Sequence, residues 1–285
     1  MTVIVPYDAG GNGDTMARAI APCLSDETGA SFVVENVPGA GGTIGTRRLV
    51  EAEPDGYTVS ISSNSPTVIT PVTTDTGYEF DDMEVVALMY ATPMILWVAG
   101  DSDIETFEDF AEASSSEEAT IATPGANSLQ DFATRALVED GAFEARVVPT
   151  DSNAEIARGV LAGDYSAGAT AVSLDYLPRI ESGEMRVIAV AGDSVPSYLP
   201  GETQTLEELG YGDALPSMSI EVPVVVPAGT PEDVQDRLTD LWRTCLDEPD
   251  VQEGVGPFLP ETFRDPDEVT DEYKELEEAI REVVG

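Results

Sequence analysis

The first 61 residues constrain the fold most strongly, because strand-like and helix-like segments alternate there and glycine-rich loops join them. Apolar runs at Thr2–Pro6, Phe32–Glu35 and Tyr57–Ile61 predict strands. Between them, apolar residues at helical spacing predict helices that begin at Asp14 and near Thr43. This order predicts a βαβαβ unit with a mostly parallel sheet.

A second α/β series follows the uncharged run Val85–Gly100, and the same spacing arguments predict its elements. These are a strand at Thr120–Ala122, a helix from Ser128, a strand at Ala145–Val148, a helix at Asn153–Ala162, a strand at Ala167–Val172, a helix at Tyr176–Glu181 and a strand at Met185–Ala191. An apolar strand, Ile220–Val226, and two more helices then return the chain to the first series. We expect an α/β protein of two lobes, formed by residues 1–98 plus 220–285 and by residues 99–219, with the ligand cleft between them.

The ionisable residues exclude several classes of function. The chain has no histidine, which excludes Ser-His-Asp and Cys-His catalysis and histidine-ligated metals. Lys274 is the only lysine, so a P-loop is absent. Lys and Arg number 13 against 55 Asp and Glu, and nucleic acid, which is bound mainly through cations, is not an expected partner. We expect no catalytic residue, no metal and no cofactor.

The acidic residues are spread along the whole chain, which gives a formal charge of −42. An even spread favours a solvated surface adapted to concentrated salt, where carboxylate repulsion is screened. The alternative, an acidic protein of an ordinary cell, predicts stable folding in dilute buffer. Cys23 and Cys245 are compatible with a disulfide and equally with two buried thiols. The N-terminus has no basic leader, which fits either a cytoplasmic protein or a trimmed mature form.

Three strand-to-helix junctions are small and polar: Pro6–Asp14, Pro38–Gly45 and Thr123–Ser128. Each places flexible backbone before a helix N-terminus, where free N–H groups and the positive end of the helix dipole favour an anion. Such a cradle needs no lysine or arginine. Tight turns without function are the alternative for any one of these loops. The dinucleotide fingerprint GxGxxG fails, because Met16 and Ile44 stand where its third glycine belongs.

Three blocks of the sequence resemble, in order and spacing, the solute-binding proteins of tripartite tricarboxylate transporters. They are Ile4–Arg18, Val33–Gly45 and Pro54–Thr58. The similarity continues through Ile121–Ser128, Gly183–Val190 and Val226–Pro231, so it covers essentially the whole chain. The resemblance implies a two-lobed fold of the periplasmic-binding-protein type II class, in which each lobe is a mainly parallel sheet flanked by helices. It also implies an extracytoplasmic receptor that closes on a small carboxylated solute and delivers it to the membrane permease subunits of such a transporter. We expect a monomer, tethered to the membrane by an N-terminal segment that this chain lacks.

In the family, the first two glycine-rich loops hold a ligand carboxylate through backbone groups and ordered water. Carried over to this sequence, the resemblance implies solute contacts at Tyr7, Ala9, Gly10, Gly11, Asn12, Asp14, Gly39, Ala40, Gly41, Gly42, Thr43, Ser63, Ser65, Gly125, Ala126, Asn127 and Ser128.

Two positions depart from the family pattern and give the far end of the pocket its own chemistry. Asp131 replaces a common histidine, and Thr170 with Ala171 replaces a common aromatic-Asp pair. We include Asp131 and Thr170 among the candidate contacts. Asp14 and Asp131 can each face a ligand amine or simply cap a helix. Arg18 is expected to form a structural ion pair, Arg47 and Arg48 are expected to offset nearby acids, and all three are excluded from the site.

Two other functions compete with solute transport. A sensory subunit that signals to a membrane kinase would use the same fold and the same site. A carboxylate-dependent enzyme would use two acids as general acid and base, but among 55 acidic residues chance pairs are everywhere.

Overall fold

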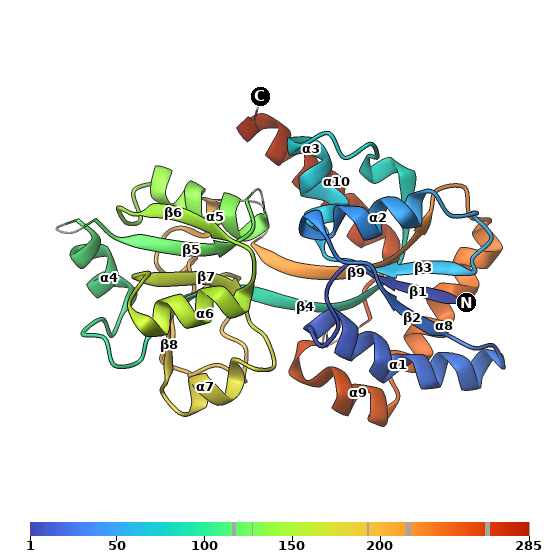
Figure 1. Ribbon diagram of the computed structural model, residues 1–285, viewed down its shortest axis with the longest axis horizontal. Helices are drawn as coiled ribbons and strands as arrows, with labels where there is room; N and C mark the ends of the chain where they lie inside the picture. The colour runs from blue at the N-terminus through green and yellow to red at the C-terminus, as the bar shows by residue number, and fades with distance from the viewer. Residues whose placement is uncertain (116–117, 127, 193, 215–217, 260–262, 285) are drawn as a thin grey trace. The chain divides into compact units, whose positions relative to one another are not determined.

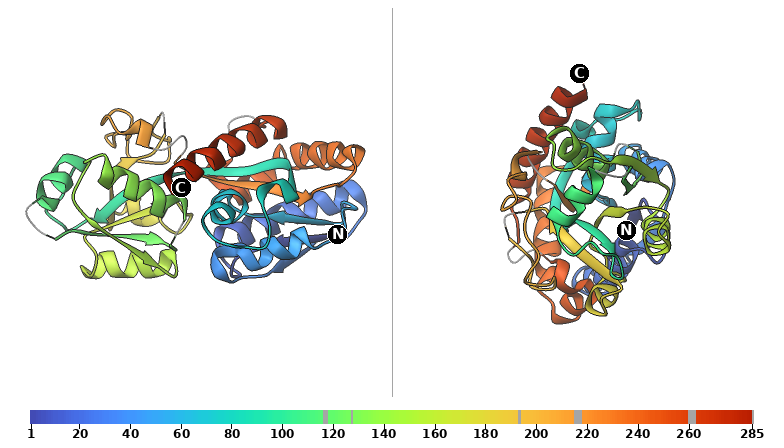
Figure 2. Two further views of the ribbon diagram at one scale, coloured as in Figure 1. Left: turned by 90° about the horizontal axis from the view of Figure 1, so that it is seen from above. Right: turned by 90° about the vertical axis from the view of Figure 1, so that its left-hand side faces the viewer.

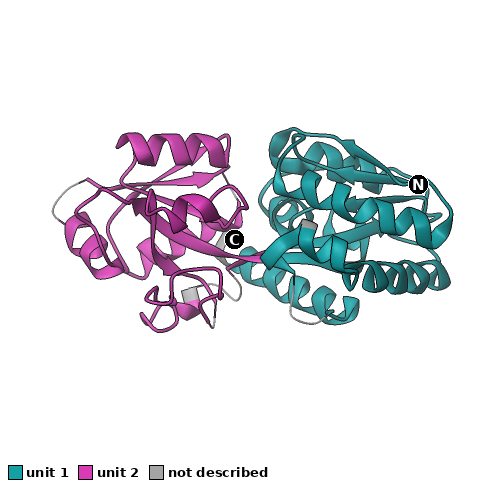
Figure 3. Cartoon of the chain, turned by 90° about the horizontal axis from the view of Figure 1, so that it is seen from below, with its two compact units in different colours: residues 1–91, 221–285 teal, residues 92–220 magenta. Residues whose placement is uncertain are grey.

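The computed structural model describes residues 1–115, 118–126, 128–192, 194–214, 218–259 and 263–284. The chain forms two compact units (Figure 3): unit 1 is Met1–Ala91 with Glu221–Gly285, and unit 2 is Thr92–Ile220. The sequence predicted the divisions after residues 98 and 219. The first division falls earlier, after Ala91, and lies within β4 (Met83–Ala99), which has residues in both units. β9 (Ser219–Pro227) likewise has residues in both units.

Unit 1 contains a sheet in the order β2-β1-β3-β9, with β4 next to β9. β1 (Thr2–Val5) pairs in parallel with β2 (Val33–Asn36) and with β3 (Thr58–Ile61). β9 runs antiparallel to β3, so the sheet is mixed. The antiparallel strand is the one on which the chain returns from unit 2.

Helices cover both faces of the unit 1 sheet (Figure 1). In this sheet β2 lies on one side of β1 and β3 on the other, so the β1-to-β2 and β2-to-β3 connections run in opposite directions. Right-handed crossovers therefore place α1 and α2 on opposite faces of the sheet. α1 packs with α8 and α9, whereas α2 contacts η2, and α10 packs on η2 and α3 (Figure 2). The helices are α1 (Asn12–Thr28), η1 (Ala40–Gly42), α2 (Thr43–Val50), η2 (Ser65–Ile69), α3 (Thr70–Thr73), η3 (Phe80–Asp82), α8 (Glu232–Leu246), α9 (Pro249–Val255), η5 (Gly256–Phe258) and α10 (Pro266–Val284).

A disulfide between Cys23 and Cys245 joins α1 to α8 inside unit 1. The sequence left this pairing open, because the two cysteines are 222 residues apart. The bond ties the returning C-terminal segment to the first helix. A disulfide is typical of proteins that work in an oxidising compartment outside the cytoplasm.

Unit 2 has the strand order β4-β7-β5-β6, with β8 also paired to β4. β5 (Thr120–Pro124) is parallel to β6 (Arg146–Thr150) and β7 (Ala167–Ala171), while β7 and β8 (Met185–Val190) run antiparallel to β4. The helices are α4 (Phe107–Ser114), α5 (Leu129–Glu139), α6 (Asn153–Ala162), α7 (Leu177–Glu181) and η4 (Gly212–Ala214). α5 and α6 pack on opposite faces of the same three strands (Figure 1). No helix in the described part of the chain is long and apolar enough to cross a membrane.

Candidate functional site

Three predicted loops meet at one edge of the unit 1 sheet. β1, β2 and β3 are parallel neighbours, so the loops after them leave from the same edge. They carry Tyr7 to Gly11, Gly39 to Gly42, and Ser63 with Ser65. In doubly wound sheets, ligands bind outside this carboxyl edge of the strands.

Tyr7 connects the three loops. Its hydroxyl lies 2.6 Å from Ser63 Oγ and accepts a hydrogen bond from the Ser63 N–H. Its carbonyl accepts from Asn36 Nδ2 at 3.1 Å, which fixes the loop after β1 to the end of β2. Burial raises the pKa of the Tyr7 phenol, and the Ser63 hydrogen bonds oppose that shift only in part. The phenol therefore stays protonated and can donate or accept a hydrogen bond.

The loop after β2 has an unusual backbone. Gly39, Ala40, Gly41 and Gly42 follow one another with φ of +129°, +48°, +65° and +99°. Ala40 is the one non-glycine residue with positive φ in the described ranges, and that conformation costs about 1 kcal/mol. A Cβ on Gly42 would lie 3.0 Å from Pro66 Cγ and 3.3 Å from the Tyr7 ring. The loop packs closely at Gly42, whereas Gly39, Ala40 and Gly41 are exposed.

The two helices that follow these loops begin without side-chain caps. Gly11 is the N-cap of α1 and Gly42 that of α2, and neither glycine has a side chain that could cap the first turn. Ala9, Gly10 and Gly11 are exposed, and Asn12 is half-buried. Thr43 is buried and donates to the Ala40 carbonyl at 2.9 Å, within its own loop. The site therefore offers main-chain N–H groups and two helix dipoles to an anion.

Asp14 is not the helix cap that one interpretation of the sequence expected, because α1 begins at Asn12. Its buried carboxylate turns back to accept from the Gly10 N–H at 2.9 Å and pairs with Arg18 at 2.8 Å. Burial raises the pKa of this carboxyl, but the hydrogen bonds from Arg18 and Gly10 outweigh burial and leave the pKa below its usual value. Asp14 is thus an ionised brace that shapes the first loop.

The arginines near the site have partners elsewhere in unit 1. Arg18 also donates to Asn36, Arg47 donates to the Thr76 carbonyl, and Arg48 forms a two-pronged ion pair with Glu35. Sequence reasoning missed Asn36, which holds both Tyr7 and Arg18. Its position at the end of a strand in the parallel sheet is the signal that could have identified it.

In unit 2, the predicted loop Gly125–Ser128 follows β5. Gly125 has φ +79° and donates its N–H to the Thr150 carbonyl at 2.8 Å, while Ala126 is exposed. Ser128 caps α5 by accepting from the Asp131 N–H at 3.1 Å. Asn127, also predicted, lies outside the described residues. This loop therefore contains one side-chain cap where the unit 1 loops have none.

The two specificity positions of unit 2 are both engaged within that unit. The Asp131 carboxylate is 2 % exposed, accepts from Thr123 Oγ1 at 3.2 Å and pairs with Arg135 at 3.1 Å. Thr170 is fully buried, and its hydroxyl accepts from the Trp97 indole at 3.1 Å. The Arg135 partner at i+4 can be seen in the sequence, whereas the Trp97 contact, 73 residues away, cannot.

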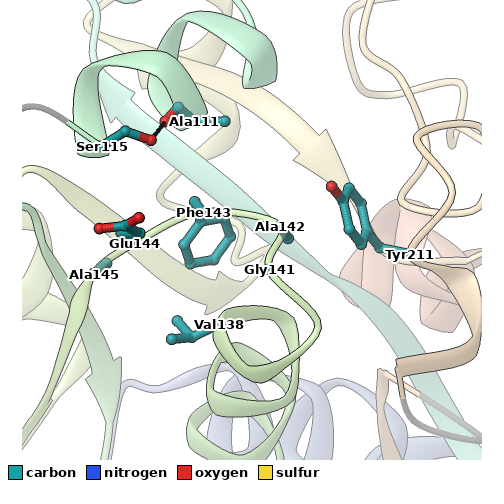
Figure 4. A pocket seen from close by; sticks show the side chains of 9 residues that line it. All are labelled: Ala111, Ser115, Val138, Gly141, Ala142, Phe143, Glu144, Ala145 and Tyr211. Carbon is teal, nitrogen blue, oxygen red and sulfur yellow. Dashed lines mark hydrogen bonds between the residues drawn. The ribbon is translucent and has the colours of Figure 1, made fainter.

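A concavity of unit 2 lies away from the Gly125–Ser128 loop. It has a volume of about 620 Å³ and is open to solvent in unit 2 (Figure 4). Its walls come from the ends of α4 and α5 and from the residues that precede β6; the lining residues are Ala111, Ser115, Val138, Gly141, Ala142, Phe143, Glu144, Ala145 and Tyr211. Because Glu144 and Ala145 precede β6, this pocket is at the amino edge of the sheet, opposite the edge from which Gly125 leaves. Within the described ranges, no group of three or more His, Cys, Asp or Glu side chains could hold a metal ion.

Comparison with known proteins identifies the family. The model of the "Tripartite tricarboxylate transporter family receptor" matches residues 16–268. This chain belongs to that family. Receptors of the family are periplasmic solute-binding proteins rather than enzymes, so the chain works outside the cytoplasm.

Individual relatives of this receptor agree with the assignment. A UPF0065 protein of Bordetella bronchiseptica is 31% identical over 264 residues, which cover 90% of this chain and 75% of the relative. A structure described as a periplasmic transporter has 25% identity and a TM-score of 0.86, covering 100% and 95% of the two chains.

Two structures from Rhodopseudomonas palustris have the same fold. MatC, solved with bound malate, has 23% identity and a TM-score of 0.83, with 100% of this chain and 98% of MatC covered. Rpa4515, solved with adipate, has 22% identity and a TM-score of 0.84, with 100% and 97% covered. They confirm the two-lobed periplasmic-binding-protein architecture predicted from the sequence.

Proposed function

We propose that this receptor captures a small solute through a carboxylate and delivers it to the membrane permease subunits of a tripartite tricarboxylate transporter. The observation that carries the proposal is the unit 1 sheet edge, where two uncapped helix N-termini, a left-handed glycine loop and the Tyr7–Ser63 pair meet. Main-chain donors at helix N-termini suit a carboxylate without any cationic side chain. MatC and Rpa4515, which have the same fold, were solved with malate and adipate, both dicarboxylates.

We propose that Tyr7, Ala9 to Asn12, Gly39 to Thr43, and Ser63 with Ser65 surround that carboxylate. The Gly125–Ser128 loop of unit 2 supplies further contacts when the receptor closes on its solute. Asp14 acts by bracing the Gly10 backbone, since its own oxygens are already engaged. Asp131 and Thr170 act through Arg135 and Trp97 in the same way, by shaping the unit 2 side of the site.

Thermal unfolding with a panel of solutes tests the proposal. Malate, adipate, citrate, acidic amino acids and inorganic phosphate are added in molar KCl, and co-purified solutes are identified by mass spectrometry. A ligand at 100 times its dissociation constant adds about 2.7 kcal/mol to the free energy of unfolding. At least one carboxylate is expected to raise the unfolding temperature. Stabilisation by phosphate alone would contradict a carboxylate receptor.

We further propose that the receptor is a monomer held at the membrane surface, where it meets the permease. The periplasmic location of the family supports this placement. Light scattering gives the oligomeric state, and fractionation of the source cells shows whether the full protein stays with the membrane. A stable dimer would contradict the monomeric state, and a protein released freely from the cells would contradict the attachment to the membrane.

The charge of −42 supports a last proposal, adaptation to concentrated salt. The Debye length is about 3 Å at 1 M salt and about 10 Å at 0.1 M, so dilution restores repulsion among the carboxylates. The unfolding temperature is expected to fall steeply as KCl is reduced from molar to 0.1 M. Equal stability at both concentrations would identify an acidic protein without salt adaptation.

A further inference from the structure

An ionic bridge with one buried end lies in unit 1, outside the loops described above. Arg264 donates from Nη1 to Glu221 Oε1 at 3.0 Å and from Nη2 to Glu272. Glu221 is only 7% exposed, whereas Glu272 is largely exposed. The buried hydroxyl of Tyr273 faces the same Glu221 carboxylate. One arginine thus links β9 to α10.

One end of the bridge is close to the candidate site along the sheet. Glu221 is the first residue of the segment that returns to unit 1, and it lies on β9. Two residues later, the Pro223 carbonyl accepts from the Ser62 N–H at 3.3 Å. Ser62 directly precedes Ser63, the partner of Tyr7. The position of β9 therefore sets where Ser63 stands.

The other end of the bridge reaches the same residue from the opposite side. α10 packs on η2, in contacts that Figure 2 places on one side of the unit. η2 begins at Ser65, and Thr67 Oγ1 within it donates to the Ser63 carbonyl at 2.9 Å. Tyr273 on α10 also packs edge-on against Phe80, which precedes β4, with ring centroids 5.8 Å apart. The Ser62–Ser63 segment is thus bonded to both β9 and η2, and Arg264 joins β9 to α10, the helix that packs on η2.

The bridge is costly to break from one side. If Arg264 is removed, the buried Glu221 carboxylate loses the positive charge that compensates its own. Glu221 must then take up a proton or reach water. Burial already raises the pKa of Glu221, and the Arg264 charge opposes that shift. Either response removes the link between β9 and α10, the two elements that contact the Ser62–Ile69 region.

We propose that Arg264 is a positioning residue for solute binding, which fixes the Ser63–Tyr7 pair by clamping β9 to α10 through Glu221 and Glu272. This inference rests on the proposed function of the Ser63–Tyr7 edge. Arg264 itself does not touch Tyr7 or Ser63.

The test compares Arg264→Gln with Arg281→Gln. Arg281 lies on α10, the helix that carries Glu272, whereas Arg264 precedes that helix; Arg281 is exposed and pairs with Glu277 one turn earlier. Affinities for malate, adipate and citrate are measured by calorimetry. Arg264→Gln is expected to weaken the tightest of them at least tenfold, whereas Arg281→Gln should leave it within twofold. Glu272→Gln, a milder change at the exposed end, should fall between them.

A control variant and a hydrogen-exchange measurement separate a positioning role of Arg264 from a general loss of stability. Leu238→Ala, in the α8 core, destabilises unit 1 without touching the bridge. If Leu238→Ala weakens solute binding as much as Arg264→Gln at a matched loss of unfolding temperature, the positioning role is wrong. Hydrogen exchange of the ligand-free protein is also followed at residues 62–69, where Arg264→Gln alone should accelerate exchange.

The outcomes distinguish a failure of the Arg264 inference from a failure of the proposed carboxylate-binding function. If the wild-type protein binds none of the carboxylates, the proposed function fails, and the exchange data still decide whether Arg264 holds Ser63. Unchanged exchange at residues 62–69 in Arg264→Gln overturns the inference. So does wild-type affinity in that variant when the wild-type protein binds a carboxylate.

Discussion

The first helices of the two units begin differently. In unit 2, Thr106, Ser128 and Ser152 each accept a hydrogen bond from the first turn of α4, α5 and α6. In unit 1, Gly11 and Gly42 stand in the same position before α1 and α2 and offer no side chain. A capped helix satisfies its own N–H groups, whereas an uncapped one leaves them to a ligand. The contrast supports the proposal that unit 1 binds the carboxylate, and the caps stabilise the helices of unit 2.

The largest expected effect concerns the disulfide, which only unit 1 contains. The double variant Cys23→Ser/Cys245→Ser should lose about 2–4 kcal/mol of unfolding free energy, because the open chain gains conformational entropy. Calorimetric unfolding should show the loss in a transition of unit 1, with that of unit 2 unchanged. A single transition shifted as a whole would show instead that the units unfold together.

Gly42→Val should abolish most solute binding. The new side chain would be strained at φ +99° and would press on Pro66 and Tyr7, so we expect a loss of about 100-fold, or about 2.7 kcal/mol. Gly163→Val in unit 2 is the matched control, because it has φ +79° and no atom within 4 Å of its Cβ. Calorimetry should show normal affinity in the control. Similar losses in both would mean that general strain, and not the site, is responsible.

Ser152→Ala removes a cap from unit 2. The variant should lose about 1 kcal/mol of unfolding free energy, because the Glu155 N–H loses its side-chain acceptor and keeps only the Ser152 carbonyl. Chemical denaturation measures the loss, and solute affinity serves as the internal control. A drop in the free energy of solute binding as large as the drop in stability would show that Ser152 contributes to the binding site.

Gly11→Ser adds to unit 1 the cap that unit 2 already has. Gly11 has φ −76° and ψ 173°, which suits an N-cap serine, and a Cβ there makes only an ordinary contact of 3.5 Å. Stability should rise by a few tenths of a kcal/mol, roughly the usual difference between glycine and serine caps. Affinity should fall, because the serine hydroxyl competes with the solute for the same N–H groups. Tighter binding by this variant would refute the contrast between the units.

The sequence predicted the parts of the fold that depend on local pattern. The helix at Asn153–Ala162 was predicted with the bounds the structure shows, because a capping serine and apolar spacing mark it. The glycine junctions predicted the convergence of loops in unit 1, since parallel strands end at one edge. The sequence also predicted a mostly parallel sheet, but the strands that cross between the units run antiparallel to their neighbours.

Long-range partners could not be predicted. The Cys23–Cys245 bond, the Trp97–Thr170 hydrogen bond and the Arg264–Glu221 bridge join residues that only the tertiary fold brings together. The role of Asp14 was missed for a different reason. A carboxylate near a helix start usually caps that helix, and only the backbone shows that the chain turns so that Gly10 becomes its partner.

The disulfide also has a consequence for proteolysis. Cys23 and Cys245 flank all of unit 2, residues 92–220, so the bond closes a covalent ring that contains that unit entirely. A protease that cuts once anywhere in unit 2 therefore releases no fragment until a reductant is added. A nicked receptor would keep both halves of unit 1 covalently joined, and electrophoresis would separate the two pieces only under reducing conditions.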